Sequence, residues 1–214
     1  MLNRGKILDA WRKKRAAGAL LRGGAAGTDY LTATSLDSLG RKTAPSLAAL
    51  LPLGDANALS IQSTKERVAD AGETPVLAGV CATDPLRMME NFLQEIKAAG
   101  AAGVQNHPSV GLLDGSFRKT LEDTGLGYGR EVEMIRIASR MDLLTAALVF
   151  SPEDARRMAE AGADLVVAHP GFQDPKSAAR AVSEIAVAAR EAKKGILVLA
   201  LDREYAGVDG FQTE

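Results

Sequence analysis

The sequence predicts an α/β fold and, within that class, a (β/α)8 barrel. Short and almost wholly apolar runs alternate along the chain with amphipathic stretches of helical length. These runs lack polar-apolar alternation, which is typical of parallel strands buried on both faces. The eight apolar runs favour a barrel over a doubly wound open sheet, because no glycine-rich phosphate fingerprint follows any of them.

A repeated unit sets the expected strand positions. A helical stretch ending in Ala-Gly leads within a residue or two into an apolar run, and glycine suits a left-handed helix C-cap. The expected strands are Ala19–Leu21, the end of Ala25–Ala33, Pro75–Cys81, the run starting at Gly103, Leu143–Phe150, the run before His169, Gly195–Leu201 and the end of Ala206–Thr213. The expected helices are Lys6–Ala17, Asp55–Ala71, Pro85–Ala99, Tyr128–Arg140, Pro152–Ala161 and Lys176–Lys193. We therefore expect one domain over residues 1–214, with residues 1–18 as a leading helix.

Two of the crossovers are too short to hold a helix. Only Arg22–Thr28 connect the first two strands, and only Asp202–Val208 connect the last two. A parallel crossover needs roughly a dozen residues, and barrels of this kind rarely fall below about 200 residues in all. We expect these crossovers to be shortened or incomplete. Strand edges left uncovered would need another subunit, so a homo-oligomer is expected as well.

Composition limits the functional class. The chain is 46% apolar and 25% charged with a formal net charge of -1, so nothing favours a nucleic-acid or membrane partner. No apolar stretch approaches the roughly 20 residues that span a bilayer. Cys81 is the single cysteine, so no internal disulfide can form and a cytoplasmic location is expected.

Polar residues that follow the apolar runs are the candidate site. The active site of such a barrel lies at the carboxyl ends of its strands. The residues in those places are Thr32, Thr34, Cys81, Thr83, Asp84, Gln105, Asn106, His107, His169, Asp202, Gln212 and Thr213. Asp84 has two interpretations: an N-cap before Pro85, or a carboxylate ligand for Mg²⁺. Cys81 is expected to be a buried, inert thiol.

The two histidines and one glycine-rich stretch leave alternatives open. His107 and His169 each precede a proline at the end of an apolar run. Each could simply end a strand, or the two could share a pocket where neutral imidazole acts as a general base or orients a substrate carboxylate. In the stretch Thr124–Arg136, where glycines precede a helix, Glu133 and Arg136 are three residues apart, so they could form a solvent-facing ion pair. The alternative is a mobile loop over the barrel mouth, with Arg118 nearby to meet an anion.

Four segments carry a resemblance to a known family. They are "LLPLGDANA" (Leu50–Ala58), "PVLAGVCATDP" (Pro75–Pro85), "GVQNHPSVGLLDGSFRKTLEDTGLGYGREVEMIRIA" (Gly103–Ala138) and "GADLVVAHPG" (Gly162–Gly171). They resemble the phosphoenolpyruvate-hydrolase-like TIM-barrel family, which includes the barrel half of certain plant viral-resistance proteins. The resemblance implies membership of the phosphoenolpyruvate/pyruvate barrels, with Mg²⁺ and an α-keto acid or enol substrate.

The resemblance also implies roles for particular residues. Asp84 would hold Mg²⁺, with His169, Glu133 and Arg136 as the other catalytic residues. The substrate-binding residues that it implies are Gln105, Asn106, Asp114 and Gln212, and it also marks Glu131 without a role. His107 and Arg118 are added as substrate-binding candidates from the residues alone. The expected activity is that of an Mg-dependent hydrolase or lyase on a small anionic substrate. The alternative is a non-catalytic regulatory barrel that binds a small anion or a protein, which the short crossovers favour.

Overall fold

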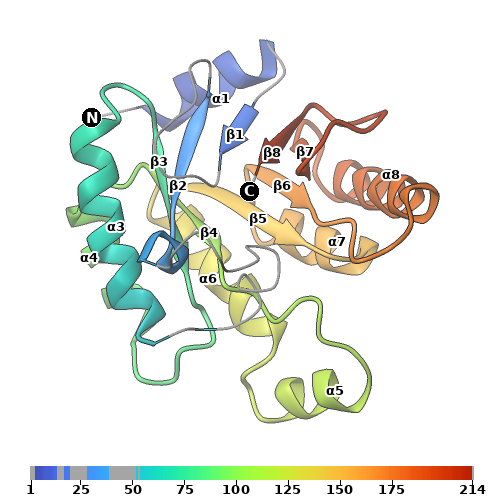
Figure 1. Cartoon of the computed structure of the whole chain (residues 1–214), viewed down its shortest axis with the longest axis horizontal. Helices are drawn as coiled ribbons and strands as arrows, with labels where there is room; N and C mark the ends of the chain where they lie inside the picture. Colours follow the sequence, from blue (N-terminus) through green and yellow to red (C-terminus); the bar gives the residue numbers. More distant parts are fainter. Residues whose placement is uncertain (1–2, 14–16, 20–27, 39–51, 53, 214) are drawn as a thin grey trace.

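The predicted barrel is confirmed. The computed structural model describes residues 3–13, 17–19, 28–38, 52 and 54–213. Its strands form a closed, all-parallel barrel in chain order, with the last strand paired to the first (Figure 1). The strands are β1 (Ala17–Ala19), β2 (Tyr30–Ala33), β3 (Val76–Val80), β4 (Gly103–Asn106), β5 (Leu144–Val149), β6 (Leu165–Ala168), β7 (Leu197–Leu201) and β8 (Gly210–Thr213).

Helices surround the barrel on most of its circumference. They are α1 (Arg4–Lys13), the short 3-10 helix η1 (Ser35–Ser38), α3 (Ala56–Asp70), α4 (Met89–Ala98), α5 (Gly115–Asp123), α6 (Tyr128–Arg140), α7 (Pro152–Glu160) and α8 (Pro175–Ala192). Figure 1 shows α3 and α4 on one side, α7 and α8 on the other, and α5 set apart from the barrel. In the part of the chain that the structure describes, no helix combines the length and apolar character needed to cross a membrane.

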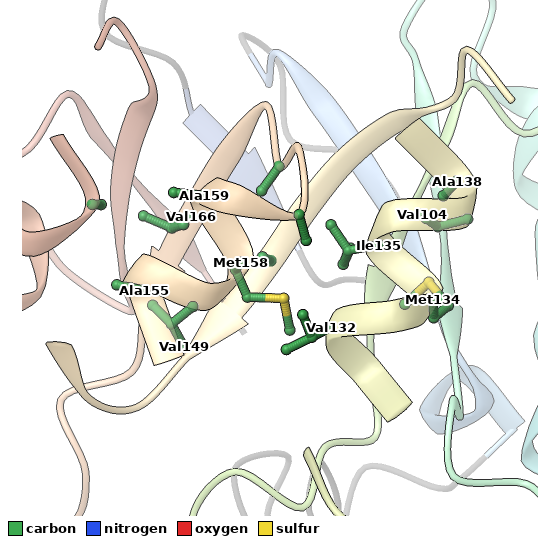
Figure 2. Close-up of a cluster of buried hydrophobic side chains, with 14 of the residues drawn as sticks. Val104, Val132, Met134, Ile135, Ala138, Val149, Ala155, Met158, Ala159 and Val166 are labelled. Carbon is green, nitrogen blue, oxygen red and sulfur yellow. The ribbon is translucent and has the colours of Figure 1, made fainter. Parts of the chain in front are cut away.

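The core has two layers, because successive strand residues point to opposite faces. Outward-facing strand residues such as Val104, Val149 and Val166 pack against Ile135 of α6 and Met158 of α7 (Figure 2). The inward-facing layer is mostly leucine, valine and alanine. Its members are Leu77, Leu144, Ala146, Leu148, Leu165, Val167, Leu197, Leu199 and Leu201.

The α1 helix packs against the amino-terminal end of the barrel. Its buried Leu8 and Trp11 join the inward-facing core, and the Trp11 ring lies 5.3 Å from the ring of Tyr30. Arg4 donates two hydrogen bonds, of 2.8 and 2.9 Å, to the carboxylate of Asp164, the residue before β6. Asp164 also accepts from the backbone N–H of Thr145 at 3.0 Å. This end of the barrel is therefore closed by apolar packing and by paired charges.

Several element boundaries differ from the prediction. The leading helix was expected over residues 1–18, but α1 ends at Lys13 and residues 17–18 already belong to β1. The helix expected to begin at Pro85 begins at Met89 instead, and Asp84 is not its N-cap. The loop expected after β4 contains α5, which buries no residue. Between β7 and β8 there is no helix, as predicted, whereas most of the short crossover after β1 (Arg22–Gly27) lies outside the described residues.

Candidate active site at the barrel mouth

The carboxyl ends of the strands, here called the mouth, bring residues from distant parts of the chain together. Strand alternation decides which side chains reach the interior. Gln105 and His107 face inward on and just after β4, whereas Asn106 between them faces outward to α6. The backbone N–H of His107 extends the β3–β4 ladder by donating to Val80 at 3.1 Å, and the His107-Pro108 peptide is cis. His107 is buried, as Gln105 and Asn106 are.

A hydrogen-bonded group crosses the barrel interior below the mouth. Gln212 Oε1 accepts from the Tyr30 hydroxyl at 2.6 Å and from Gln105 Nε2 at 3.1 Å. Gln212 Nε2 donates in return to Gln105 Oε1 at 3.3 Å. The structure therefore brings the predicted residues Gln105 and Gln212 together: their amides bond to each other, and the Gln212 amide also bonds to Tyr30.

His169 stands at the end of β6 with one ring nitrogen unsatisfied. It is 4% exposed, and its Nδ1 accepts from the backbone N–H of Gly171 at 2.9 Å. Burial lowers the pKa of His169, while the carboxylate of Asp202 acts in the opposite direction. In the neutral imidazole the ring proton is thus on Nε2, and this buried N–H has no partner among the described residues. Such a donor is available for an oxygen atom of a ligand.

Aromatic rings and a small cleft border His169. The ring of Phe150 lies 5.2 Å from the imidazole, and Phe172 meets it edge-on at 5.9 Å. A cleft of about 130 Å³ lies beside the end of β6. It is lined by Pro170, Gly171, Gln173, Pro175, Ala178, Leu201, Asp202, Arg203 and Tyr205. Asp202 has a φ of 69°, a conformation that side-chain-bearing residues adopt infrequently.

Glu131 is a buried carboxyl group behind the end of β4. Its Oε2 accepts from Asn106 Nδ2 at 2.6 Å and from Ser109 Oγ at 2.7 Å, and its Oε1 accepts from the backbone N–H of Val110 at 2.8 Å. Burial raises the pKa of Glu131 to about 7, and these three hydrogen bonds oppose that rise. Glu131 is absent from the catalytic and substrate-binding residues predicted above, although it lies in a matching segment.

Asp84 is held by partners within the chain. Its Oδ2 accepts from Asn57 Nδ2 at 2.9 Å and lies 3.4 Å from Arg87 Nε, while its Oδ1 accepts from the backbone N–H of Leu86 at 2.9 Å. Asn57 also donates to the backbone carbonyl of Cys81 and accepts from its backbone N–H. Burial raises the pKa of the Cys81 thiol, which suits the inert role expected for it.

Asp114 precedes the first residue of α5, and Arg118 lies one turn further along the helix. Arg118 donates to Glu122 and to the carbonyl of Gly111, both at 3.0 Å, and its guanidinium lies 5.2 Å from the ring of Tyr128. Arg118 therefore joins α5 to the rest of the molecule. Asp114 is exposed at the N-cap position of α5, without a side-chain capping bond.

Glu133 and Arg136 are not brought to the mouth. Both lie on the exposed face of α6, where Arg136 donates to Glu133, and Arg140 lies 3.5 Å from the same carboxylate. The solvent-facing ion pair is therefore the interpretation that fits the structure, and the catalytic assignment of these two residues is corrected. Helix geometry is the reason, because residues two apart point to nearly opposite faces and Glu131 takes the inward one.

The described residues do not form a fitting Mg²⁺ site. Mg²⁺ is held by carboxylate oxygens and waters in near-octahedral geometry. Both oxygens of Asp84 already accept from N–H groups, one of them beside a guanidinium. No cluster of three or more His, Cys, Asp or Glu side chains suited to a metal occurs in the ranges that the structure describes.

Comparisons with known proteins agree with the fold and the segments. The chain is 57% identical to the tomato (Solanum lycopersicum) ToMV resistance protein Tm-1(GCR237) over 127 residues, which cover 59% of this chain and 17% of that protein. It is 34% identical to the "Putative transcriptional regulatory protein y4pA" of Sinorhizobium fredii, over 73% of this chain and 25% of that protein. The chain thus spans a quarter or less of the length of these relatives.

A solved structure shows the same fold at low sequence identity. A "putative phosphonomutase" from Burkholderia cenocepacia J2315 superposes with a TM-score of 0.54 at 17% identity, covering 98% of this chain and 92% of that one. Residues 21–201 match the family described as phosphoenolpyruvate hydrolase-like, which is most of the chain. The chain therefore belongs to the phosphoenolpyruvate hydrolase-like family.

Proposed function

We propose that this chain is a hydrolase or lyase that acts at the barrel mouth on a small phosphoenolpyruvate- or keto-acid-like substrate. The observation that carries the proposal is the unsatisfied Nε2–H of His169, buried at the catalytic end of a barrel of this family. A buried donor without a partner costs roughly 1–3 kcal/mol, so its retention favours a role with a ligand.

The chemistry follows from the state of the imidazole. Cleavage of an enol phosphate or a keto acid develops negative charge on a substrate oxygen. A fixed N–H donor stabilises that charge. The Nε2 atom is buried and Phe150 packs against the ring, and this low-dielectric setting strengthens a hydrogen bond made there. His169 is thus proposed to orient the substrate and to stabilise the developing charge.

Magnesium dependence, the bound anion and the homo-oligomer stay predictions. Because the donor set around Asp84 does not fit Mg²⁺, no step of this proposal goes through a metal. Comparing turnover with added Mg²⁺ and with a chelator tests the first of these predictions. Light scattering of the purified chain tests the third, and a clean monomer would contradict it.

The proposal is tested by pyruvate release from phosphoenolpyruvate, phosphonopyruvate and oxaloacetate. We expect turnover of at least one substrate, and a loss on the order of 100-fold in His169→Leu. His169→Gln keeps an N–H donor near the position of Nε2 and should retain more activity than the leucine variant. Arg136→Gln is the matched control on the exposed face of α6 and should leave turnover unchanged. The absence of turnover with all three substrates would contradict the proposal.

A second candidate is a non-catalytic barrel that binds a small anion or a protein. It is favoured by the internal bonding of Asp84, Arg118 and Arg136, three residues predicted above to bind or act on a substrate or metal. Thermal-shift measurements with keto acids and nucleotides distinguish the two candidates. Stabilisation by a ligand without any turnover, and unchanged in Asp84→Ala, would support the second candidate over the first.

A further inference from the structure

The carboxyl group of Glu131 is the part of the mouth that the proposed function does not use. It lies in the first turn of α6, fully buried, against the end of β4 and the residues that follow it. Residues 107–111, here called the β4 exit loop, contain two of its three hydrogen-bond donors. The third, Asn106, precedes that loop directly. One side chain therefore holds both the end of a strand and the loop that contains His107.

The partners of Glu131 are all donors in the observed arrangement. The backbone N–H of Val110 can only donate. The amide of Asn106 cannot turn over, because its Oδ1 accepts from the Leu148 N–H at 2.7 Å and its Nδ2 donates to the Leu148 carbonyl at 3.0 Å. Ser109 is the exception, because a hydroxyl can both donate and accept. Its Oγ already accepts from the Gly111 N–H at 3.1 Å.

These partners limit the hydrogen bond that a protonated Glu131 can donate. A protonated carboxyl group needs an acceptor for its O–H, and Ser109 Oγ is the group among these partners that can supply one. The Ser109 hydroxyl hydrogen would then turn away from Glu131, and the bond from Ser109 would reverse its direction. The proton comes from solvent, and no covalent bond other than the carboxyl O–H forms or breaks. Ser109 lies within the β4 exit loop, so the reversal takes place in that loop.

We propose that Glu131 positions the β4 exit loop, and that protonation of Glu131 reverses its hydrogen bond with Ser109. Glu131 is a positioning residue in this proposal, since it acts through the loop and not on a substrate. The proposal is independent of the proposed function, because its test needs no substrate.

The charges around Glu131 place the transition near neutral pH. Burial raises the pKa of Glu131 to about 7, and the Asp154 carboxylate of α7 acts in the same direction. The charge of Glu131 also acts on Tyr128 of the same helix and on Cys81 after β3. Burial raises the pKa of both groups, so they stay neutral. Arg118 of α5 lies 3.5 Å from Asp154 and offsets part of that charge.

The test follows the backbone amide of Val110 by NMR in the intact chain between pH 5.5 and 8.5. This amide donates directly to Glu131, so its proton shift should change with a midpoint near pH 7 in the wild type. Glu131→Gln should abolish that step. Glu133→Gln, two residues along the same helix and exposed, is the matched control and should keep it.

A second variant covers the case in which Glu131→Gln does not fold. Ser109→Ala removes one donor to the carboxylate, which raises the pKa of a carboxyl group. The midpoint of the Val110 shift should move upward by about half a pH unit or more. A flat Val110 titration in the wild type, a step that persists in Glu131→Gln, or an unmoved midpoint in Ser109→Ala would each overturn the proposal.

Discussion

The two ends of the barrel treat their buried polar groups differently. At the amino-terminal end, Asp164 is bonded to Arg4 and Thr145, and the Trp11 ring of α1 packs against Tyr30. At the mouth, His169 keeps an unsatisfied donor, and Glu131 is ionised only at the cost of burying its charge. The amino-terminal end thus satisfies its buried polar groups, which favours stability, whereas the mouth keeps buried groups that are unfavourable for stability. The mouth is the end at which barrels of this fold have their active sites.

The largest effect should come from the amino-terminal end. Trp11→Ala removes a buried ring that closes the barrel interior, so we expect the free energy of unfolding to fall by about 4 kcal/mol. Lys6→Ala on the exposed side of the same helix should change it little. Urea denaturation followed by circular dichroism measures both. A small loss in Trp11→Ala would mean that α1 does not contribute to barrel stability.

Glu131 should make stability depend on pH. The usual pKa of this group is 4.5 and the folded value is about 7, so the folded chain holds the proton more tightly than the unfolded chain. The resulting stability is present below pH 4.5 and is lost as the pH rises through 7, by up to about 3 kcal/mol. Glu131→Gln should remove this contribution, and Glu133→Gln should retain it. Parallel curves for the wild type and Glu131→Gln would contradict the assignment.

Replacing His169 should separate stability from function. His169→Leu removes an unsatisfied buried donor and keeps an apolar contact with Phe150, but it also removes the acceptor of the Gly171 N–H. These effects oppose each other, so the free energy of unfolding should change by no more than about 1 kcal/mol. Turnover or ligand binding should fall in the same variant. Thermal denaturation together with the pyruvate assay provides both measurements. A marked loss of stability would show that the histidine is a structural part of the mouth.

The smallest effect is expected on the outer face of α6. Glu133 and Arg136 form an exposed ion pair, and such pairs contribute roughly 0–1 kcal/mol. Arg136→Gln should therefore lower the free energy of unfolding by less than about 0.5 kcal/mol and leave turnover as it is. Loss of activity in this variant would restore the catalytic interpretation of the pair.

The strands could be predicted because both of their faces are buried, which requires an almost wholly apolar sequence. Runs such as Leu143–Phe150 and Gly195–Leu201 are apolar on both faces, so their order along the chain predicts the order around the barrel. Helix α5 gave a weaker signal, since only Phe117 and Leu121 form its apolar face and it buries no residue. The boundary error at Pro85 has another cause. Asp84 is held by Asn57, 27 residues earlier, and no local pattern reports that contact.

The site was predicted less well, and Glu131, which the resemblance marks without a role, could have been placed more exactly. Gln105, Asn106 and His169 follow from strand ends, but whether their side chains bond each other or a ligand depends on the packed interior. Glu131 precedes Ile135 by four residues and Ala138 by seven, which is the spacing of one buried helix face. That periodicity separates Glu131 from Glu133 without a structure.

The hydrogen-bonded group of Tyr30, Gln105 and Gln212 should constrain how these positions change in evolution. It links β2, β4 and β8 across the inside of the barrel, with Gln212 as the hydrogen-bond partner of both Tyr30 and Gln105. A single substitution at any of the three positions leaves a buried polar atom without its partner. Such a substitution lowers stability until the other positions change as well. Among relatives these positions should therefore be exchanged together, and an apolar residue at one should accompany apolar residues at all three.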